Sequence, residues 1–265
     1  MATEKAFDKA AVNYDSEFTD TAVGRLQRNR VWNYLRANFS SAEFPSVLEL
    51  NCGTGEDAIW LSRHGFRVVA TDLSSEMIQI ATRKAEIAKQ KIEFDVCSFE
   101  NVGNKYAPGS FDLVLSDFGG LNCIDERQIR LLAENLSVLL RPGGRFVAVV
   151  MSDDCTLEKL YFKRKGERIK AARRKDKNGT ATVIENETFT TWYYSPDKFS
   201  SLVNHVFTTR KTKAVGWMIP PSYLNAYFVK RPGLLRTLNI IENTIGNMSA
   251  FARKADHFLI DLQRK

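Results

Sequence analysis

The chain has 265 residues, of which 44% are hydrophobic and 26% charged, and its formal net charge is +7. This is the composition of a globular protein. It excludes a membrane-spanning chain, because no apolar run approaches the roughly 20 residues that cross a bilayer. The first residues lack the apolar stretch of a secretory signal. The four cysteines lie far apart, without a CxxC pair or the spacing of metal ligands. We therefore expect free thiols, no metal site and a cytoplasmic location.

The first 150 residues alternate between short apolar runs and helical patterns. The runs, rich in Val, Ile, Leu and Phe, predict strands buried on both faces, at 47–50, 67–71, 92–96, 111–115 and 145–150. Apolar residues at helical spacing predict the intervening helices, over 57–64, from Ser74 or Ser75 to about Ala88, and around 129–139, where "RPGG" predicts a turn. Such alternation predicts a parallel sheet covered by helices, with ligands at the carboxyl ends of its strands.

After residue 150 the pattern changes. A basic helix is expected over about 155–175, followed by the alternating pattern of a hairpin in "ATVIE" and "ETFTTWYY". Ser195 and the following proline predict the start of another helix. A strand around 206–217, a helical stretch interrupted by prolines and a final strand at 256–262 complete the chain.

Much of the positive charge lies in "KLYFKRKGERIKAARRKDKNG", residues 159–179. One interpretation is a site for nucleic acid, anionic lipid or an acidic substrate. The other, which we favour, is the solvated face of a helix, because acidic residues dilute the charge.

A glycine loop follows the first predicted strand, in "VLELNCGTGEDA" at 47–58. Gly53, Gly55 and Ala58 satisfy the dinucleotide fingerprint, and an aspartate ends the next strand, which by themselves predict NAD. Glu56 and Asp57, however, place carboxylates on the helical turn where a pyrophosphate would bind. Like charges about 4 Å apart cost on the order of 1 kcal/mol even in water. S-adenosylmethionine has no phosphate and carries a sulfonium and an ammonium, so the acids favour it over a dinucleotide.

Four segments, "VLELNCGTG", "VVATDLSSEMIQIA", "FDLVLSD" and "LRPGGRFVAVV", resemble the successive signatures of class I S-adenosylmethionine-dependent methyltransferases. "FDKAAVNYD" resembles the start of the small-molecule branch, of type 11/25, and the likeness covers about 7–150. It implies an α/β, Rossmann-like, doubly wound seven-stranded sheet whose last strand alone is antiparallel. A hairpin and a helical lid are expected in the C-terminal half.

The resemblance also implies an organisation of the chain. We expect an N-terminal helical cap over 1–40, the cofactor-binding core over 41–154, and the late strands of the core within 155–265. Lid insertions on the acceptor side are expected at about 159–194 and 218–252. Aromatic residues are concentrated in these two segments, and apolar walls suit a planar or lipid-like small molecule.

The resemblance implies a role for each residue that matches the family's motifs. For the methionine end of the cofactor it implies Glu49, Gly53, Thr54 and Gly55, with Asn51 replacing the usual glycine and holding the turn. For the ribose hydroxyls it implies Asp72, a carboxylate suited to two O–H donors. For the adenine it implies Leu73, Met77, Asp95, Val96 and Cys97. Strand termination for Asp72 and Asp95, and core packing for Leu73, Met77 and Val96, are the structural alternatives.

Four further residues follow from the resemblance. Ser116 and Asp117 end the fourth strand, where the methyl group would be presented. Tyr14 is expected to lie over the cofactor, and Arg28 to reach its carboxylate, although Arg25 and Arg30 are equally basic.

Methyl transfer from a sulfonium mainly requires alignment and desolvation of the two reactants. A general base is needed only when the acceptor must lose a proton. His257, which opens the final strand at the edge expected to face the pocket, and Tyr14 are weak candidates. No catalytic residue is assigned.

The sequence thus predicts an enzyme that methylates a small molecule at O, N or C. The alternatives are an RNA or protein methyltransferase that uses the basic stretch at 159–177, and a catalytically silent cofactor-binding protein. Nucleic acid is disfavoured because no RNA-binding module is recognisable. A nicotinamide oxidoreductase is disfavoured by the acids of the glycine loop. The acceptor, the atom methylated and the oligomeric state stay open.

Overall fold

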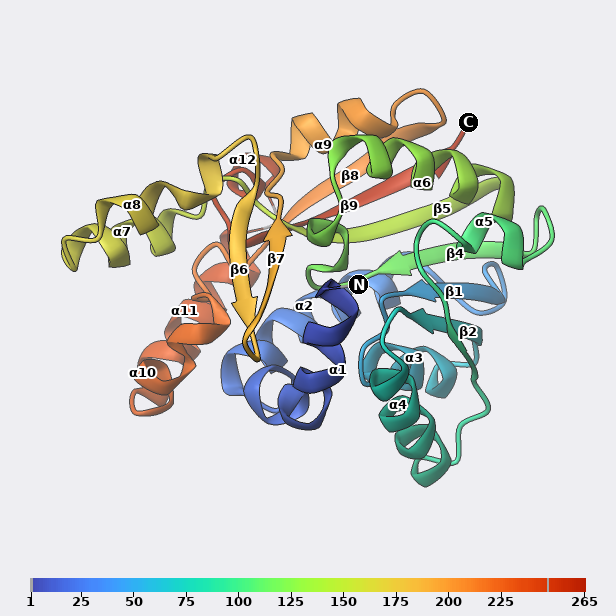
Figure 1. The fold of residues 1–265 in the computed structure, drawn as a ribbon, viewed down its shortest axis with the longest axis horizontal. Coiled ribbons are helices and arrows are strands. Elements are labelled where there is room, and N and C mark those ends of the chain that lie inside the picture. The colour runs from blue at the N-terminus through green and yellow to red at the C-terminus, as the bar shows by residue number, and fades with distance from the viewer. Residues whose placement is uncertain (1, 247) are drawn as a thin grey trace.

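The computed structural model describes residues 2–246 and 248–265, and its centre is a seven-stranded sheet (Figure 1). The strand order is β3-β2-β1-β4-β5-β9-β8. The strands are β1 (Ser46–Leu50), β2 (Arg67–Asp72), β3 (Glu93–Val96), β4 (Phe111–Ser116), β5 (Leu140–Met151), β8 (Phe207–Val215) and β9 (His257–Arg264). Strands β1 to β5 are parallel, whereas β9 is antiparallel to both β5 and β8. The predicted Rossmann-like sheet is confirmed, and its antiparallel last strand lies between two others rather than at the edge.

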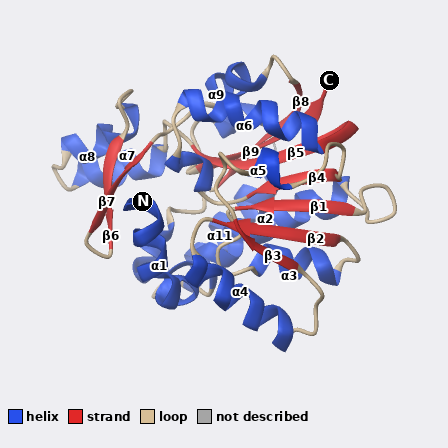
Figure 2. Ribbon diagram, turned by 45° about the vertical axis from the view of Figure 1, so that its right-hand side comes forward, coloured by secondary structure: helices blue, strands red, loops and turns tan. Residues whose placement is uncertain are grey.

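Helices cover both faces of this sheet (Figure 2). One face is covered by α2 (Ala22–Asn38), α3 (Glu56–Arg63) and α4 (Ser75–Ile87), and the other by α5 (Val102–Lys105), α6 (Glu126–Leu139) and α9 (Pro196–Val203). The second half of strand β5, residues 146–151, is an unbroken apolar run because both of its faces are buried. Val147 and Val149 pack in the first core, whereas Phe146, Ala148 and Val150 pack in the second. A strand buried on both faces needs apolar residues at every position.

Side-chain caps set the starts of three of these helices. Ser74 accepts a hydrogen bond from the backbone of Met77 at the start of α4, and Ser195 caps α9 as predicted. Asp125 and Gln128 form a capping box at the start of α6. Each bond satisfies a backbone N–H that the helix itself leaves without a partner.

The predicted turn at "RPGG" is wrong, because residues 141–144 lie within β5. Phe111 pairs with Leu140 and Leu113 with Arg145, so the pairing advances two residues along β4 and five along β5. Gly143, with φ of +77°, takes up this irregularity. The segment is therefore a bulge at the start of the strand, and such extra residues bend a strand without ending it.

The N-terminal helix α1 (Ala2–Tyr14) continues as a π-helix, η1 (Asp15–Thr19), and packs against the separate hairpin of β6 (Thr180–Ile184) and β7 (Glu187–Thr191). The rings of Phe7 and Phe189 are 5.7 Å apart, and Lys9 pairs with Glu187 at 2.6 Å. The predicted hairpin is confirmed, and it lies against the first helix of the chain.

The basic segment is not one helix. It comprises α7 (Thr156–Arg164), α8 (Arg168–Ala172) and the 3₁₀ turn η3 (Arg173–Lys175), with Gly166 at φ of +76° between the first two. The remaining elements are η2 (Gly120–Cys123), η4 (Ser222–Leu224), α10 (Asn225–Val229), α11 (Pro232–Ile245) and α12 (Ser249–Ala252). Within the described ranges, no helix has both the length and the apolar character that a bilayer crossing demands.

Candidate cofactor and acceptor site

A cavity of about 200 Å³ lies where the carboxyl ends of β1, β2 and β4 meet α1. Seven residues implied by the resemblance line it: Tyr14, Asn51, Gly53, Asp72, Leu73, Met77 and Cys97. Ten others were not foreseen from the sequence: Thr3, Phe7, Ser98, Phe99, Glu100, Phe118, Gly120, Cys123, Ile124 and Gln128. Its location agrees with the rule that ligands bind beyond the carboxyl ends of parallel strands.

Asp72 anchors the glycine loop from the end of β2. One carboxylate oxygen accepts from the backbone N–H of Gly53 at 2.8 Å, and the other from that of Ser74 at 2.9 Å. Burial raises the pKa of Asp72 despite these backbone donors. A carboxylate oxygen accepts more than one hydrogen bond, so both remain able to receive a donor from the cavity.

The backbone comes close to the cavity at Gly53, which has φ of +53°. A Cβ added there would lie 3.7 Å from Cε1 of Tyr14. The tyrosine thus lies directly over the loop. At Gly55, by contrast, an added Cβ would lie 2.8 Å from Cβ of Ala81, so this glycine serves the packing of α3 on α4.

Two buried carboxylates lie deeper in the molecule, at the ends of β1 and β4. Glu49 is 1% exposed and Asp117 is 6% exposed. Among the described residues, Oε2 of Glu49 and Oδ2 of Asp117 have no hydrogen-bond partner. Burial, together with the nearby charge of Asp57, raises the pKa of both carboxyl groups. Buried polar atoms normally have partners, so these two oxygens suit a donor or a cation supplied by a ligand.

The acids of the glycine loop are paired within the protein, which corrects the argument made from their sequence position. Asp57 forms a buried ion pair with Arg28 and accepts from Nε1 of Trp32 at 2.6 Å. Glu56 lies 3.1 Å from the ammonium of Lys84. Neither acid lines the cavity. Of the acids near the site, Asp72 therefore lines the cavity, whereas Glu49 and Asp117 are buried outside its lining.

Arg28 is distinguished from its basic neighbours by its burial and its partners. Its guanidinium lies 5.6 Å from the ring centre of Phe18 and 5.2 Å from that of Phe118. Arg25 is exposed, and Arg30 pairs with Glu242 at 3.2 Å on the far side of α2. Nε of Arg28 has no partner in the described part of the chain.

Asn51 occupies the left-handed backbone region, with φ of +45°, as the sequence led us to expect. Its side-chain amide joins two loops, since Nδ2 donates to the carbonyl of Asp117 at 2.6 Å and Oδ1 accepts from Ser116 Oγ at 2.6 Å. Phe118, which follows Asp117 in the chain, has the same φ of +45° as Asn51. A bulky residue in that conformation is strained, so the amide helps to fix the loop that presents Phe118 to the cavity.

Three residues implied by the resemblance are turned toward other partners or lie at the surface. Thr54 donates to Asp15 at 2.6 Å. Asp95 accepts from the hydroxyl of Tyr106 at 2.6 Å and lies 3.0 Å from Lys105. Val96 is 51% exposed. None of the three lines the cavity, where Ser98 and Phe99 follow Cys97 instead.

The two weak candidates for a general base have different surroundings. Burial raises the pKa of Tyr14 to about 12, so its phenol keeps its proton at neutral pH and can donate a hydrogen bond rather than act as a base. His257 lies outside the cavity wall, with its ring 5.5 Å from that of Phe118 and Nδ1 3.2 Å from Asp256.

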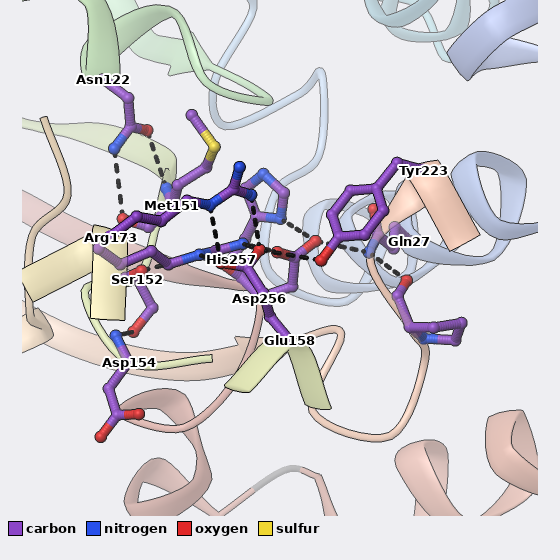
Figure 3. A network of polar contacts seen from close by, with 12 residues as sticks. Gln27, Asn122, Met151, Ser152, Asp154, Glu158, Arg173, Tyr223, Asp256 and His257 are labelled. Atoms are coloured by element: carbon purple, nitrogen blue, oxygen red, sulfur yellow. Dashed lines mark hydrogen bonds and ion pairs between the residues drawn. The ribbon is translucent and has the colours of Figure 1, made fainter. Parts of the chain in front are cut away.

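His257 belongs to a buried polar network at the start of β9 (Figure 3). Arg174 is its centre, 2.8 Å from Glu158 and 2.6 Å from Asp256. Arg173 and the hydroxyl of Tyr223 also bind Glu158. Burial favours the neutral form of the Glu158 carboxyl group, but the two arginines hold its pKa below the usual range. Two arginines of the basic stretch are therefore structural.

The cover of the cavity comes from α1, through Thr3, Phe7 and Tyr14. None of the lining residues belongs to 159–194 or 218–252. The hairpin in the first of these segments packs on α1, and Trp217 and Phe251 stack on each other with ring centres 3.9 Å apart. The hairpin of the first predicted lid segment thus lies behind the helix that forms the cover, whereas α10 of the second packs against α2.

Comparisons with known proteins agree with this arrangement. Residues 47–144 match a family model described as "Methyltransferase domain". Demethylmenaquinone methyltransferase of Clavibacter sepedonicus is 32% identical over 141 residues, which are 53% of this chain and 54% of the relative. The chain spans between about two fifths and two thirds of the length of the first curated relatives that it matches.

Solved structures share the fold over nearly the whole chain. N-methyltransferase NodS from Bradyrhizobium japonicum, in complex with S-adenosyl-L-homocysteine, has a TM-score of 0.61 at 13% identity and covers 100% of this chain and 99% of its own. 1,6-Didemethyltoxoflavin-N1-methyltransferase from Burkholderia thailandensis has a TM-score of 0.58 at 18% identity and covers 100% of this chain and 87% of its own.

The fold and the cavity define a Rossmann-like protein with a ligand site at the carboxyl edge of its sheet. The matched domain at residues 47–144 is a methyltransferase domain, and with this fold the chain resembles the class I S-adenosylmethionine-dependent methyltransferases, of type 11/25. S-adenosyl-L-methionine is the cofactor of that family.

Proposed function

We propose that the protein transfers a methyl group from S-adenosylmethionine to a small-molecule acceptor. One observation supports this most strongly. A buried aspartate at the end of β2 retains free acceptor capacity, and two buried carboxylates at the ends of β1 and β4 have oxygens without partners among the described residues. Hydroxyl donors match the first, and a cationic amino-acid moiety matches the other two.

Each proposed contact follows from these residues. Asp72 accepts from the ribose hydroxyls, while Gly53 allows the backbone to approach the ligand. Glu49 and Asp117 face the positively charged end, and Arg28 reaches the carboxylate. Leu73 and Met77 pack on the adenine. Asp95 is engaged with Tyr106 and Lys105, so we propose Ser98 rather than Asp95 as the polar contact beside the adenine.

When bound, the cofactor supplies an activated methyl group whose carbon–sulfur bond breaks as the acceptor's lone pair forms the new bond. The protein's part is to hold both reactants in line and to exclude water. Tyr14 and Phe118, which both line the cavity, provide that enclosure. The high pKa of Tyr14 makes it a hydrogen-bond donor, so an acceptor that must lose a proton releases it to another group or to solvent.

The acceptor is proposed to be apolar or planar. The apolar residues proposed to face the acceptor are Phe7, Phe99, Phe118 and Ile124. The hydrogen-bonded polar pair of Glu100 and Gln128 also lines the cavity. Such walls with few polar groups are typical of small-molecule sites. The relatives named above include N-methyltransferases and a demethylmenaquinone methyltransferase, so the atom methylated is left open.

The test is transfer of a labelled methyl group. Purified protein is incubated with methyl-labelled S-adenosylmethionine and small-molecule extracts, and S-adenosylhomocysteine release is followed in parallel. We expect label in an extractable small molecule. Label only in RNA or in protein would contradict the acceptor class, and cofactor binding without transfer under any of these conditions would favour a silent protein.

A further inference from the structure

Exposed apolar side chains are concentrated in two neighbouring segments beyond the carboxyl edge of the sheet. Within the described residues, fifteen large hydrophobic side chains are exposed, and nine of them lie in these segments: Leu160, Ile169, Tyr223, Tyr227, Val229, Leu234, Ile240, Ile245 and Met248. Scattered exposed hydrophobic residues are normal, but a concentration of them marks an interaction surface.

The same segments carry the positive charge of the protein. Residues 156–177 contain ten Lys and Arg against three Asp and Glu, a formal charge of +7 that equals the charge of the whole chain. Part of this charge is used internally, by Lys159, Lys170, Arg173, Arg174 and Lys175. Eight exposed cations have no acidic partner within 4.0 Å in the described part of the chain: Lys163, Arg164, Lys165, Arg168, Lys177, Lys230, Arg231 and Arg236.

The two segments are in direct contact. The ring of Tyr223 lies 6.4 Å from that of Tyr161 and 6.1 Å from that of Phe162, and its hydroxyl donates to Glu158. Helix α7 follows the carboxyl end of β5, and η4 follows that of β8, so both project from the edge that holds the cavity (Figure 1).

We propose that this apolar-basic surface, formed by the exposed side chains of 160–177, 223–246 and 248, docks on an anionic lipid bilayer. The headgroup region of such a bilayer attracts Lys and Arg, and the boundary below it takes up apolar side chains. Ile169 is 89% exposed and lies between Arg168 and Lys170 in the chain. An aliphatic side chain among cations contributes to binding at a lipid interface, whereas non-specific nucleic-acid binding rests mainly on phosphate contacts. A second copy of the chain is disfavoured because the two positive surfaces would repel each other.

The experiment is a vesicle flotation assay with the full chain. Vesicles of phosphatidylcholine alone are compared with vesicles that contain about 30 mol% phosphatidylglycerol. We expect binding to the anionic vesicles only, weakened by salt as screening requires. The assay needs neither cofactor nor acceptor, so its outcome is independent of the proposed methyl transfer.

Matched variants locate the surface. Three charge reversals on α7 and α8, and in the turn between them, remove cations from it: Lys163→Glu, Lys165→Glu and Arg168→Glu. The control has three reversals on exposed residues near α3 and α4: Arg63→Glu, Arg83→Glu and Lys91→Glu. We expect the first set to lower the vesicle partition coefficient about 100-fold, a several-fold loss per cation, and the control to lower it by less than about 10-fold because its charges act only at long range.

Apolar docking is tested separately by Ile169→Ser combined with Leu234→Ser. Both side chains are exposed, so this variant should fold, and circular dichroism together with the urea midpoint checks that it does. A clear loss of anionic-vesicle binding is expected. The proposal would be overturned by absence of anionic-vesicle binding, by equal losses in the first set and the control, or by serine substitutions without effect. Binding of tRNA that vesicles do not compete for would identify nucleic acid as the partner, and concentration-dependent dimerisation lost in the same variants would identify a second copy.

Discussion

At the residue scale, Asp72 has the most specific position in the candidate site. It is buried, it lies at the end of β2, and it holds the glycine loop through Gly53. Its role as the ribose acceptor was implied by the sequence resemblance and stays a prediction.

Replacing Asp72 with alanine should weaken S-adenosylmethionine binding about 10- to 100-fold, because a hydrogen bond to a charged group contributes about 1.5–3 kcal/mol. An asparagine side chain at this position would retain one acceptor oxygen, so the affinity of Asp72→Asn should fall between those of the wild type and Asp72→Ala. Calorimetric titration measures both affinities. Wild-type affinity in the alanine variant would mean that the ribose binds elsewhere.

Asn51 offers a second prediction, because its backbone and its side chain have separate roles. Asn51→Gly keeps a residue suited to φ of +45° but loses the bonds to Ser116 and to the Asp117 carbonyl. With two hydrogen bonds of about 1 kcal/mol each, partly offset by relief of the left-handed backbone, we expect unfolding free energy to fall by about 1 kcal/mol.

Asn51→Ala is the matched comparison, since it loses the same bonds and adds backbone strain. It should be less stable than Asn51→Gly by about 1 kcal/mol in urea unfolding. Equal stability of the two variants would show that the left-handed backbone at position 51 does not strain the alanine variant. A glycine variant as stable as the wild type would show that the amide does not fix the loop.

At the element scale, the buried network of α7, η3 and β9 gives the C-terminal half a pH dependence. Neighbouring arginines lower the pKa of Glu158, and His257 and Arg174 lower that of Asp256, in both cases against the effect of burial. Carboxyl groups with depressed pKa values contribute stability above their unfolded value of about 4, and this is lost as pH falls through the folded values. Unfolding free energy should therefore decrease below about pH 4.

Removing the central cation tests this network. Arg174→Met leaves Glu158 and Asp256 buried with fewer counter-charges, which should cost about 3–5 kcal/mol at pH 7. The loss should shrink toward pH 4, because the two acids then protonate more easily. Denaturant unfolding at both pH values measures this, with Lys165→Met, an exposed position, as control. A loss that did not change with pH would indicate that packing, rather than charge, is responsible.

The elements show how far the sequence could predict the fold. The strands were predictable because a strand such as β5, buried on both faces, leaves an apolar run that few other structures produce. The bulge at 141–144 was not, since "RPGG" has the composition of a turn and only pairing with β4 makes it part of a strand. The division of the basic helix occurs at Gly166, whose positive φ a glycine allows but the sequence does not require.

The candidate site was predictable where it depends on strand ends. Asp72 and Gly53 follow apolar runs directly and line the cavity. Phe118, Cys123 and Ile124 line it too, but they come from an irregular loop that carries no periodic signal. The sequence placed Arg174 on a solvated helix face, because its two acidic partners lie 16 and 82 residues away in the chain and leave no local signal.

At the scale of the whole molecule, the structure separates two regions with different electrostatic character. Buried carboxylates gather around the cavity at the carboxyl edge of the sheet, whereas cations without acidic partners among the described residues lie on the helices that extend beyond it. We expect the first region to favour a cationic ligand over a diphosphate. This is the same preference that the glycine loop suggested, although different acids produce it.

Direct calorimetric titration with S-adenosylmethionine and with NADH tests this preference most directly. We expect saturable binding of S-adenosylmethionine with one site per chain, and no measurable heat or competition from NADH. Saturable binding of NADH that S-adenosylmethionine fails to displace would contradict the assignment of the cavity and, with it, the proposed reaction.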